Sequence, residues 1–385
     1  MKFNKYRISH YFIFSISGLN YLIAILLNSF FRRKNNKIML FGHKLVGNLE
    51  AIFKDTRLGE NNFFYMTLNY RDYLYLKKIH GNKIATPLNI FHLLNGLRCK
   101  IVITSHGIFL HNTIKKLGIK TILCGHAIDA AIPKNKEKII RYFELFDEVW
   151  LHSPYHEKIV SRELLCKSSN LNMIGYPRNQ LLIENNRSKE DLKIKNNLDG
   201  KKVILYAPTS NRGDKNYIKS EFSPFNINFY KFMKEELLNS NIVLIVKTHL
   251  NDIISEEINA LVKKEKNIFF KEDMNIIYDY DLMILSDVLV TDLSTIYVDY
   301  LLLEKPIYII DNPDPDPSTE RSSILKYIDL PKIHNEEELK SFILKLKDDK
   351  LESENIINLK NNIYGNLNHL KTIEKINQTL SSDSK

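Results

Sequence analysis

The clearest sign of the fold is the segment Asp287-Val-Leu-Val-Thr-Asp-Leu-Ser-Thr-Ile-Tyr-Val-Asp-Tyr-Leu301. Its apolar first part predicts a buried strand that ends at Thr291 and Asp292. A helix is predicted to begin directly afterwards, over residues 296–303. A buried strand followed at once by a helix is the repeating unit of parallel sheets, so this segment indicates an α/β fold.

The same alternation of short apolar runs and helical segments extends outward over most of the chain. Predicted strands lie at residues 38–41, 63–67, 101–104, 121–124 and 148–152 in a first series, and at residues 203–207, 242–247, 268–270, 287–291 and 306–310 in a second. A polar, charge-rich stretch over residues 184–202 separates the two series and indicates an interdomain linker with one short helix. We therefore expect two Rossmann-like domains of similar size that face each other across a cleft.

These boundaries divide the chain into five expected parts. They are a membrane-associating helix (1–36), an N-terminal Rossmann-like domain (37–185), a linker (186–202), a C-terminal Rossmann-like domain (203–345) and C-terminal helices (346–385). The chain has 385 residues, of which 44% are hydrophobic. It is longer than one hydrophobic core usually supports, which agrees with two domains.

The chain is basic, with 55 Lys and Arg against 45 Asp and Glu, and its net charge of +10 suits an anionic partner. No DNA- or RNA-binding motif accompanies this charge, so we expect no nucleic acid and favour an anionic membrane or a phosphate-rich substrate. The three cysteines, Cys99, Cys124 and Cys166, are odd in number and lack metal-ligand spacing. They favour a reducing compartment without a disulfide framework or a zinc site.

The N-terminal segment carries a separate signal, because no charged residue occurs between Arg7 and Arg32. Residues 11–31 are long and apolar enough to span a bilayer as a helix. However, both flanks are basic, and the polar residues Ser17 and Asn20 fall near one helical face. These features favour an anchor in the plane of the membrane. A true span and a helix packed on the protein itself stay open, and a cleaved signal peptide is not expected.

Ligands of open α/β domains lie at the carboxyl ends of the strands, where helix N-termini offer N–H groups to anions. Ser294 and Thr295 stand at such a position and can form a phosphate cradle or a plain helix cap. His249 and Lys247 emerge from the end of the strand at residues 242–247. An imidazolium there can neutralise a departing phosphate, or His249 can be an ordinary surface histidine.

In the first domain, His126 follows Gly125 at the end of a strand and is a candidate general base, since its pKa matches that task. His106, in Thr104-Ser-His-Gly, is a rival for the same role, and either residue can instead be structural. Arg178 lies on the tight turn Gly175-Tyr-Pro-Arg, where it can clamp a phosphate or bridge the domains. Thr209 follows the first strand of the second domain.

Taken in order, these segments resemble the CDP-glycerol glycerophosphotransferase family, which includes primases and polymerases of teichoic acid synthesis. The resemblance covers residues 37–311. It rests on the Gly-x-Pro-Arg turn at residues 175–178, Leu-Tyr-Ala-Pro-Thr at residues 205–209, the strand-end His249, the Asp-x-Leu-x-Thr-Asp signature at residues 287–295, and Lys305-Pro306. Each motif alone is weak, but five in register are specific.

The resemblance implies a GT-B type fold without metal or cofactor, in which residues 37–185 bind the acceptor and residues 203–345 bind a CDP-polyol. It implies transfer of glycerol phosphate, or a related polyol phosphate, to a lipid-linked or polymeric envelope acceptor with release of CMP. The site is expected at the cytoplasmic face of the membrane. The implied catalytic residues are the base His126 and His249, which stabilises the phosphate charge as CMP leaves. The implied substrate-binding residues are Arg178, Thr209, Lys247, Asp292, Ser294 and Thr295.

The chain also departs from the family's pattern. The family's His-Gly-Thr-Pro-x-Lys is replaced by Gly125-His-Ala-Ile-Asp129, and Leu250, Leu293 and Gln180 replace a proline, a tyrosine and an acidic residue. The usual Arg-Gly-Phe segment is missing, and Arg321 is a candidate substitute. These changes favour a divergent member with another polyol or acceptor. A nucleotide-sugar glycosyltransferase of capsule or lipopolysaccharide synthesis and an inactive envelope scaffold are the alternatives.

Overall fold

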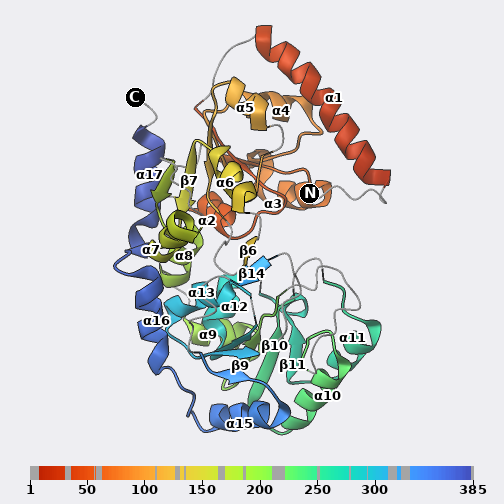
Figure 1. The fold of residues 1–385 in the computed structure, drawn as a ribbon. Coiled ribbons are helices and arrows are strands. Elements are labelled where there is room, and N and C mark those ends of the chain that lie inside the picture. Colours follow the sequence, from red (N-terminus) through yellow and green to blue (C-terminus); the bar gives the residue numbers. More distant parts are fainter. Residues whose placement is uncertain are drawn as a thin grey trace. The chain divides into compact units, whose positions relative to one another are not determined.

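The computed structural model forms two compact units (Figure 1). It describes residues 8–30, 36–55, 57, 63–108, 111–125, 131–133, 136–163, 170–184, 188–209, 222–248, 252–276, 279–292, 294–310, 319–321 and 330–382. The first unit comprises Met1–His126, Asn135–Gln180 and Leu367–Lys385, and the second comprises Ala127–Lys134 and Leu181–Asn366. Each unit is built on a parallel sheet, so the α/β fold expected from the sequence is confirmed.

The sheet of the first unit has seven strands in the order β3-β2-β1-β4-β5-β7-β8, and every neighbouring pair is parallel. Their bounds are β1 (Ile38–Phe41), β2 (Phe63–Met66), β3 (Ile84–Ala85), β4 (Ile101–Thr104), β5 (Lys120–Leu123), β7 (Glu148–Leu151) and β8 (Leu171–Met173). The inner strands are buried on both faces, which explains why they are continuous apolar runs in the sequence.

Helices cover both faces of this sheet. Their bounds are α1 (Ile8–Phe30), α2 (Asn48–Lys54), α3 (Tyr70–His80), α4 (Ile90–Leu97), α5 (His111–Lys116), α6 (Lys136–Glu144), α7 (Pro154–Lys158) and α17 (Thr372–Ser382). Helix α8 (Pro177–Glu184) contains the boundary between the units, which falls after Gln180. One core joins the sheet to α2, α3 and α17, and a second core joins it to α1, α4 and α5. The last helix of the chain therefore belongs to the first unit.

The sheet of the second unit has six strands in the order β11-β10-β9-β12-β13-β15, again all parallel. Their bounds are β9 (Lys202–Tyr206), β10 (Ile242–Val246), β11 (Ile268–Phe270), β12 (Val288–Thr291), β13 (Ile307–Ile310) and β15 (Lys332–Ile333). In chain order this is the sequence 3-2-1-4-5-6 of dinucleotide-binding sheets, and the first unit begins in the same way. The topological switch point, where such sheets bind ligands, lies between β9 and β12.

The helices of the second unit are α9 (Lys189–Lys195), α10 (Ile227–Glu236), α11 (Glu256–Val262), α12 (Asp279–Leu285), α13 (Ile296–Tyr300), α15 (Glu336–Lys347) and α16 (Glu354–Tyr364). A short antiparallel pair, β6 (Ala131–Pro133) with β14 (Thr319–Arg321), also belongs to this unit. The stretch expected as a linker contains α9, whose Lys189 and Lys193 bind Asp287 at the start of β12. This helix is therefore packed on the second sheet.

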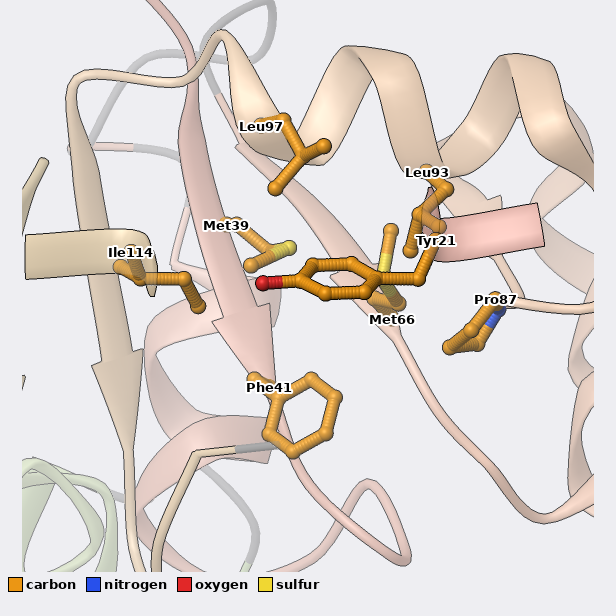
Figure 2. Close-up of a pocket in the computed structure, with 8 residues that line it drawn as sticks. All are labelled: Tyr21, Met39, Phe41, Met66, Pro87, Leu93, Leu97 and Ile114. Carbon is orange, nitrogen blue, oxygen red and sulfur yellow. The ribbon is translucent and has the colours of Figure 1, made fainter. Parts of the chain in front are cut away.

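The N-terminal helix α1 lies along α4 (Figure 1). Asn20 Nδ2 donates to the carbonyl oxygen of Leu88 at 2.8 Å, and Arg98 Nε donates to Asn28 Oδ1 at 3.2 Å. Figure 2 shows the ring of Tyr21 pointing from α1 into a small apolar pocket. The pocket is lined by the apolar side chains of Met39, Phe41, Met66, Pro87, Leu93, Leu97 and Ile114. Within the described ranges, we find no helix whose length and apolarity together suffice to cross a membrane.

Candidate functional site

The carboxyl ends of β9 and β12 are tied together by one carboxylate. Asp292 is buried, and its Oδ1 accepts hydrogen bonds from the backbone N of Thr209 at 2.7 Å and from Thr209 Oγ1 at 2.6 Å. The same oxygen accepts from the backbone N of Ser294 at 3.2 Å. Thr291 Oγ1 adds a bond to the carbonyl oxygen of Ala207 at 2.7 Å. The two loops that flank the switch point are therefore held in one fixed arrangement.

Ser294 and Thr295 lie between β12 and α13, as the sequence indicates. Thr295 occupies the N-cap position of α13, but its side chain makes no capping hydrogen bond. Of the two hypotheses for this residue, the plain helix cap therefore does not describe its side chain. Both residues are partly exposed beside the buried Asp292.

Lys247 follows β10 and forms an ion pair with Asp279 at the start of α12, with Nζ 3.4 Å from Oδ2. Lys271, which follows β11, pairs with the other carboxylate oxygen of Asp279. Partial desolvation raises the pKa of the Asp279 carboxyl, but the two lysines lower it by more, so its pKa lies below the ordinary value. We had named Lys247 from the sequence. Nothing in the local pattern pointed to Lys271 or Asp279.

In the first unit, the buried side chain of Asn48, the first residue of α2, joins this helix to the residues that follow β5. Its Nδ2 donates to the carbonyl oxygens of Cys124 at 3.2 Å and Gly125 at 3.3 Å. Its Oδ1 accepts from the backbone N of Arg178 at 3.4 Å, which links the Pro-Arg turn to the same point. The Arg178 guanidinium lies over the ring of Tyr176, 4.6 Å from its centroid. Asn48 therefore joins the segment that precedes His126 to the turn that carries Arg178.

Gly125 and Gly175 have φ angles of +70° and +92°, which side chains rarely adopt. A Cβ on Gly125 would also lie 2.9 Å from the hydroxyl oxygen of Tyr176. Both glycines are thus required by the shape of this site.

Several predicted residues can be located, and others cannot. His126 and His249 lie outside the described residues, as do Leu250 and Leu293. The rival base, His106, is exposed after β4, with its Nδ1 2.9 Å from Ser105 Oγ. Gln180 is fully buried and bonds the backbone of Leu370 and Ile373, so its place in the motif serves to hold the C-terminal segment.

The Lys-Pro motif lies at the opposite edge of the second sheet from the strand ends. Lys305 precedes β13, and its Nζ donates to the carbonyl oxygens of Met283 at 3.3 Å and Ser286 at 2.7 Å. Burial, with repulsion from Lys189, lowers the pKa of Lys305 to about 7. Lys305 therefore caps α12 and does not reach the candidate site.

Two parallel sheets that both contain the strand order 3-2-1-4-5-6, with polar residues at the switch point of the second, define a doubly wound α/β protein. The chain belongs to the CDP-Glycerol:Poly(glycerophosphate) glycerophosphotransferase family, whose model matches residues 30–367. The family named from the sequence motifs is thereby confirmed.

One curated relative is the teichoic acid poly(glycerol phosphate) polymerase of Bacillus spizizenii, which is 38% identical over 136 residues. That match covers 34% of this chain and about one third, 33%, of the relative. Among solved structures, a variant of the wall teichoic acid polymerase TagF has a TM-score of 0.73 at 17% identity, over 95% of this chain and 93% of that chain. TagF soaked with CDPG gives the same values. Anabaena HepE in complex with UDP and glucose gives 0.51 at 11% identity, over 90% and 100%. These structures are similar to the chain in fold.

Proposed function

We propose that this chain transfers glycerol phosphate, or a related polyol phosphate, from CDP-glycerol to a teichoic-acid-like or capsular acceptor and releases CMP. The family match over residues 30–367 supports the reaction class. The observation that carries the proposal is the tie that Asp292 makes between the ends of β9 and β12. It presents Thr209, Ser294 and Thr295 at the switch point, where a nucleotide phosphate binds in such sheets.

In the proposed reaction, an acceptor hydroxyl attacks the phosphorus that bears the glycerol. The bond from this phosphorus to the bridging oxygen breaks, and CMP leaves with the negative charge. Such in-line transfers depend on positioning and charge stabilisation. His249 and Lys247 stabilise that charge, while Thr209, Ser294 and Thr295 hold the donor phosphates.

The acceptor side of the reaction is assigned to the first unit. His126 takes the proton of the attacking hydroxyl, with His106 as the rival, and Arg178 binds a phosphate of the acceptor or donor. The link that Asn48 makes between Gly125 and Arg178 supports this assignment, because it keeps the two candidate segments at one strand edge. A GT-B arrangement, in which residues 37–185 and 203–345 face a cleft, is part of the proposal. The shared strand order of the two sheets supports it.

We propose further that α1 lies in the plane of an anionic membrane at the cytoplasmic face, near a lipid-linked or polymeric acceptor. Most exposed side chains in the described part of α1 are aliphatic, with Leu19 59%, Leu22 60% and Leu26 62% exposed, and Ser15 is the polar exception. Its polar Asn20 and Asn28 instead bond the protein beneath. An apolar outer face flanked by basic residues in the sequence suits the boundary between lipid headgroups and acyl chains.

The reaction is tested by incubating the purified chain with CDP-glycerol, CDP-ribitol or UDP-sugars and following the released nucleotide. CMP release from CDP-glycerol in the presence of a polyol phosphate acceptor is the expected result. Preference for CDP-ribitol would keep the reaction and change the polyol. UDP release alone would contradict the proposal in favour of a glycosyltransferase, and release of neither nucleotide would favour a scaffold.

The membrane proposal is tested by sedimentation with vesicles of phosphatidylglycerol or phosphatidylcholine. Leu22→Glu with Leu26→Glu should abolish sedimentation with the anionic vesicles. The matched control carries Leu238→Glu and Leu344→Glu, because these leucines are equally exposed, 66% and 59%, but lie in the second unit. Equal loss in both double variants would contradict a specific role of α1.

A further inference from the structure

Two lysines occupy equivalent places at the carboxyl ends of neighbouring strands. Lys247 is the first residue after β10, and Lys271 is the first residue after β11. The register pairs Val246 with Phe270, so both lysines leave the sheet at the same edge. This is the edge that also carries Asp292, because all strands of the sheet are parallel.

One carboxylate holds both lysines. Lys247 contacts one oxygen of Asp279 and Lys271 contacts the other, so the two ammonium groups share one carboxylate. The lysine side chains are 23% and 19% exposed, whereas that of Asp279 is 49% exposed. The ammonium groups are therefore held near the protein, while solvent reaches the carboxylate between them.

The cluster of Lys247, Lys271 and Asp279 carries an excess of positive charge. Two lysines against one ionised carboxylate leave this cluster with a net charge of +1. A lysine side chain is flexible, so a partner that fixes its ammonium group prepares that group to bind a ligand. A pair of fixed ammonium groups on one strand edge is suited to a dianionic or polyanionic ligand.

The spacing of the strands relates this cluster to the switch point. Neighbouring strands lie about 4.8 Å apart, so β10 is about 10 Å from β12 and β11 is about 14 Å from it. A nucleoside diphosphate ester extends over a comparable length. A diphosphate at the end of β9, which lies between β10 and β12, can therefore contact Ser294 on one side and the two lysine side chains on the other.

We propose that Lys271 binds the diphosphate of the donor together with Lys247, and that Asp279 positions both ammonium groups for it. This inference rests on the proposed function. On binding, the ammonium groups transfer hydrogen bonds from the Asp279 carboxylate to phosphate oxygens, and no covalent bond changes. Lys271 is thus a further substrate-binding residue, and Asp279 is a positioning residue.

The test compares Lys271→Met with Lys345→Met. Lys345 is a matched control, since it pairs with Glu352 at 2.9 Å on the surface of the same unit. In a CMP-release assay, Lys271→Met should raise the KM for CDP-glycerol at least about tenfold with kcat within about threefold. Lys345→Met should leave both constants unchanged. A KM for Lys271→Met within twofold of wild type would overturn the inference.

A second measurement separates this inference from the proposed function. Calorimetric binding of CDP reports on the diphosphate without turnover, and Lys271→Met should weaken it about tenfold. If the wild type binds CDP but releases no CMP from CDP-glycerol, the proposed function fails while the lysine pair is still tested. If the wild type does not bind CDP, the inference itself is overturned.

The role of Asp279 is tested by Asp279→Asn, which keeps the shape of the side chain. We expect a higher KM for CDP-glycerol with kcat unchanged, because the two ammonium groups lose the charge that fixes them. A lower KM would overturn the positioning role and make Asp279 a competitor of the donor phosphates.

Discussion

The strand ends of the two units are held by different kinds of contact, although the two sheets share one strand order. In the second unit the contacts are charged, with Asp292 on Thr209 and Asp279 between two lysines. In the first unit they are neutral or aromatic, with Asn48 on backbone groups and Tyr176 under Arg178. The same topology can therefore place charged side chains at the strand ends of one sheet and fix the backbone conformation at the strand ends of the other.

The largest effect should come from the residue assigned to the leaving phosphate. We expect His249→Ala to lower kcat with CDP-glycerol by about 10²-fold or more, since preformed electrostatic donors are typically worth that much. His334→Ala is the control, because His334 is an exposed histidine of the same unit. A loss of less than about tenfold would remove His249 from the mechanism.

The base of the first unit is tested by the same assay. His126→Ala and His106→Ala are compared over a range of pH, because loss of a general base removes the acidic limb of the kcat profile. The residue whose loss leaves both kcat and this limb unchanged is not the base. Retention of the limb in both variants would contradict a histidine base.

The charged tie of the second unit should contribute more to stability than the neutral tie of the first. Asp292→Ala leaves the partly buried backbone N of Thr209 without its acceptor and should lower the free energy of unfolding by about 2–3 kcal/mol. Urea unfolding measures this change, and the KM for CDP-glycerol should rise in parallel. Unchanged stability would show that the loops after β9 and β12 do not depend on the carboxylate.

Asn48→Ala should have a smaller effect, about 1–2 kcal/mol, because the bonds it loses are neutral and long. Urea unfolding again gives the value, with Asn361→Ala, an exposed asparagine of α16, as control. An effect larger than that of Asp292→Ala would reverse the comparison between the two units.

The smallest effect concerns acid stability. Burial raises the pKa of the Asp287 carboxyl, but hydrogen bonds from Lys189, Lys193 and the backbone of Val203 lower it further, so its folded-state pKa is depressed. Its contribution is therefore fully present above the unfolded pKa of about 3.9 and is lost as the pH falls through the lower folded value. Asp287→Asn should therefore be less stable than the wild type at pH 7. The difference in the free energy of unfolding should shrink as the pH falls below about 4. An equal deficit at both pH values would contradict the linkage.

Much of each sheet could be predicted from local pattern. The runs at residues 38–41 and 101–104 are strands β1 and β4 with those bounds, and the run at residues 242–247 contains β10. The helix expected over residues 296–303 begins at Ile296, but its last turn, Leu301–Leu303, is a 3-10 helix that ends at the left-handed Glu304. Only two residues long, β3 was missed because so short a run has no period to recognise.

The candidate site could be predicted in part. Thr209, Asp292 and Ser294 were each named from their place after a strand. In the structure, Thr209 and the backbone N of Ser294 both bond the carboxylate of Asp292. Asn48 and Asp279 gave no local signal, since each acts through partners distant in the chain. The assignment of chemical roles stays a prediction.

The local sequence was sufficient for the α/β class, the two series of strands and the family, because period, strand ends and short motifs are properties of neighbouring residues. Tertiary structure alone decided that α17 returns to the first sheet, that α1 turns its asparagines inward, and that Asp279 joins Lys247 to Lys271. Most of these contacts join residues far apart in the chain, and no local pattern records which distant partners a folded backbone brings together.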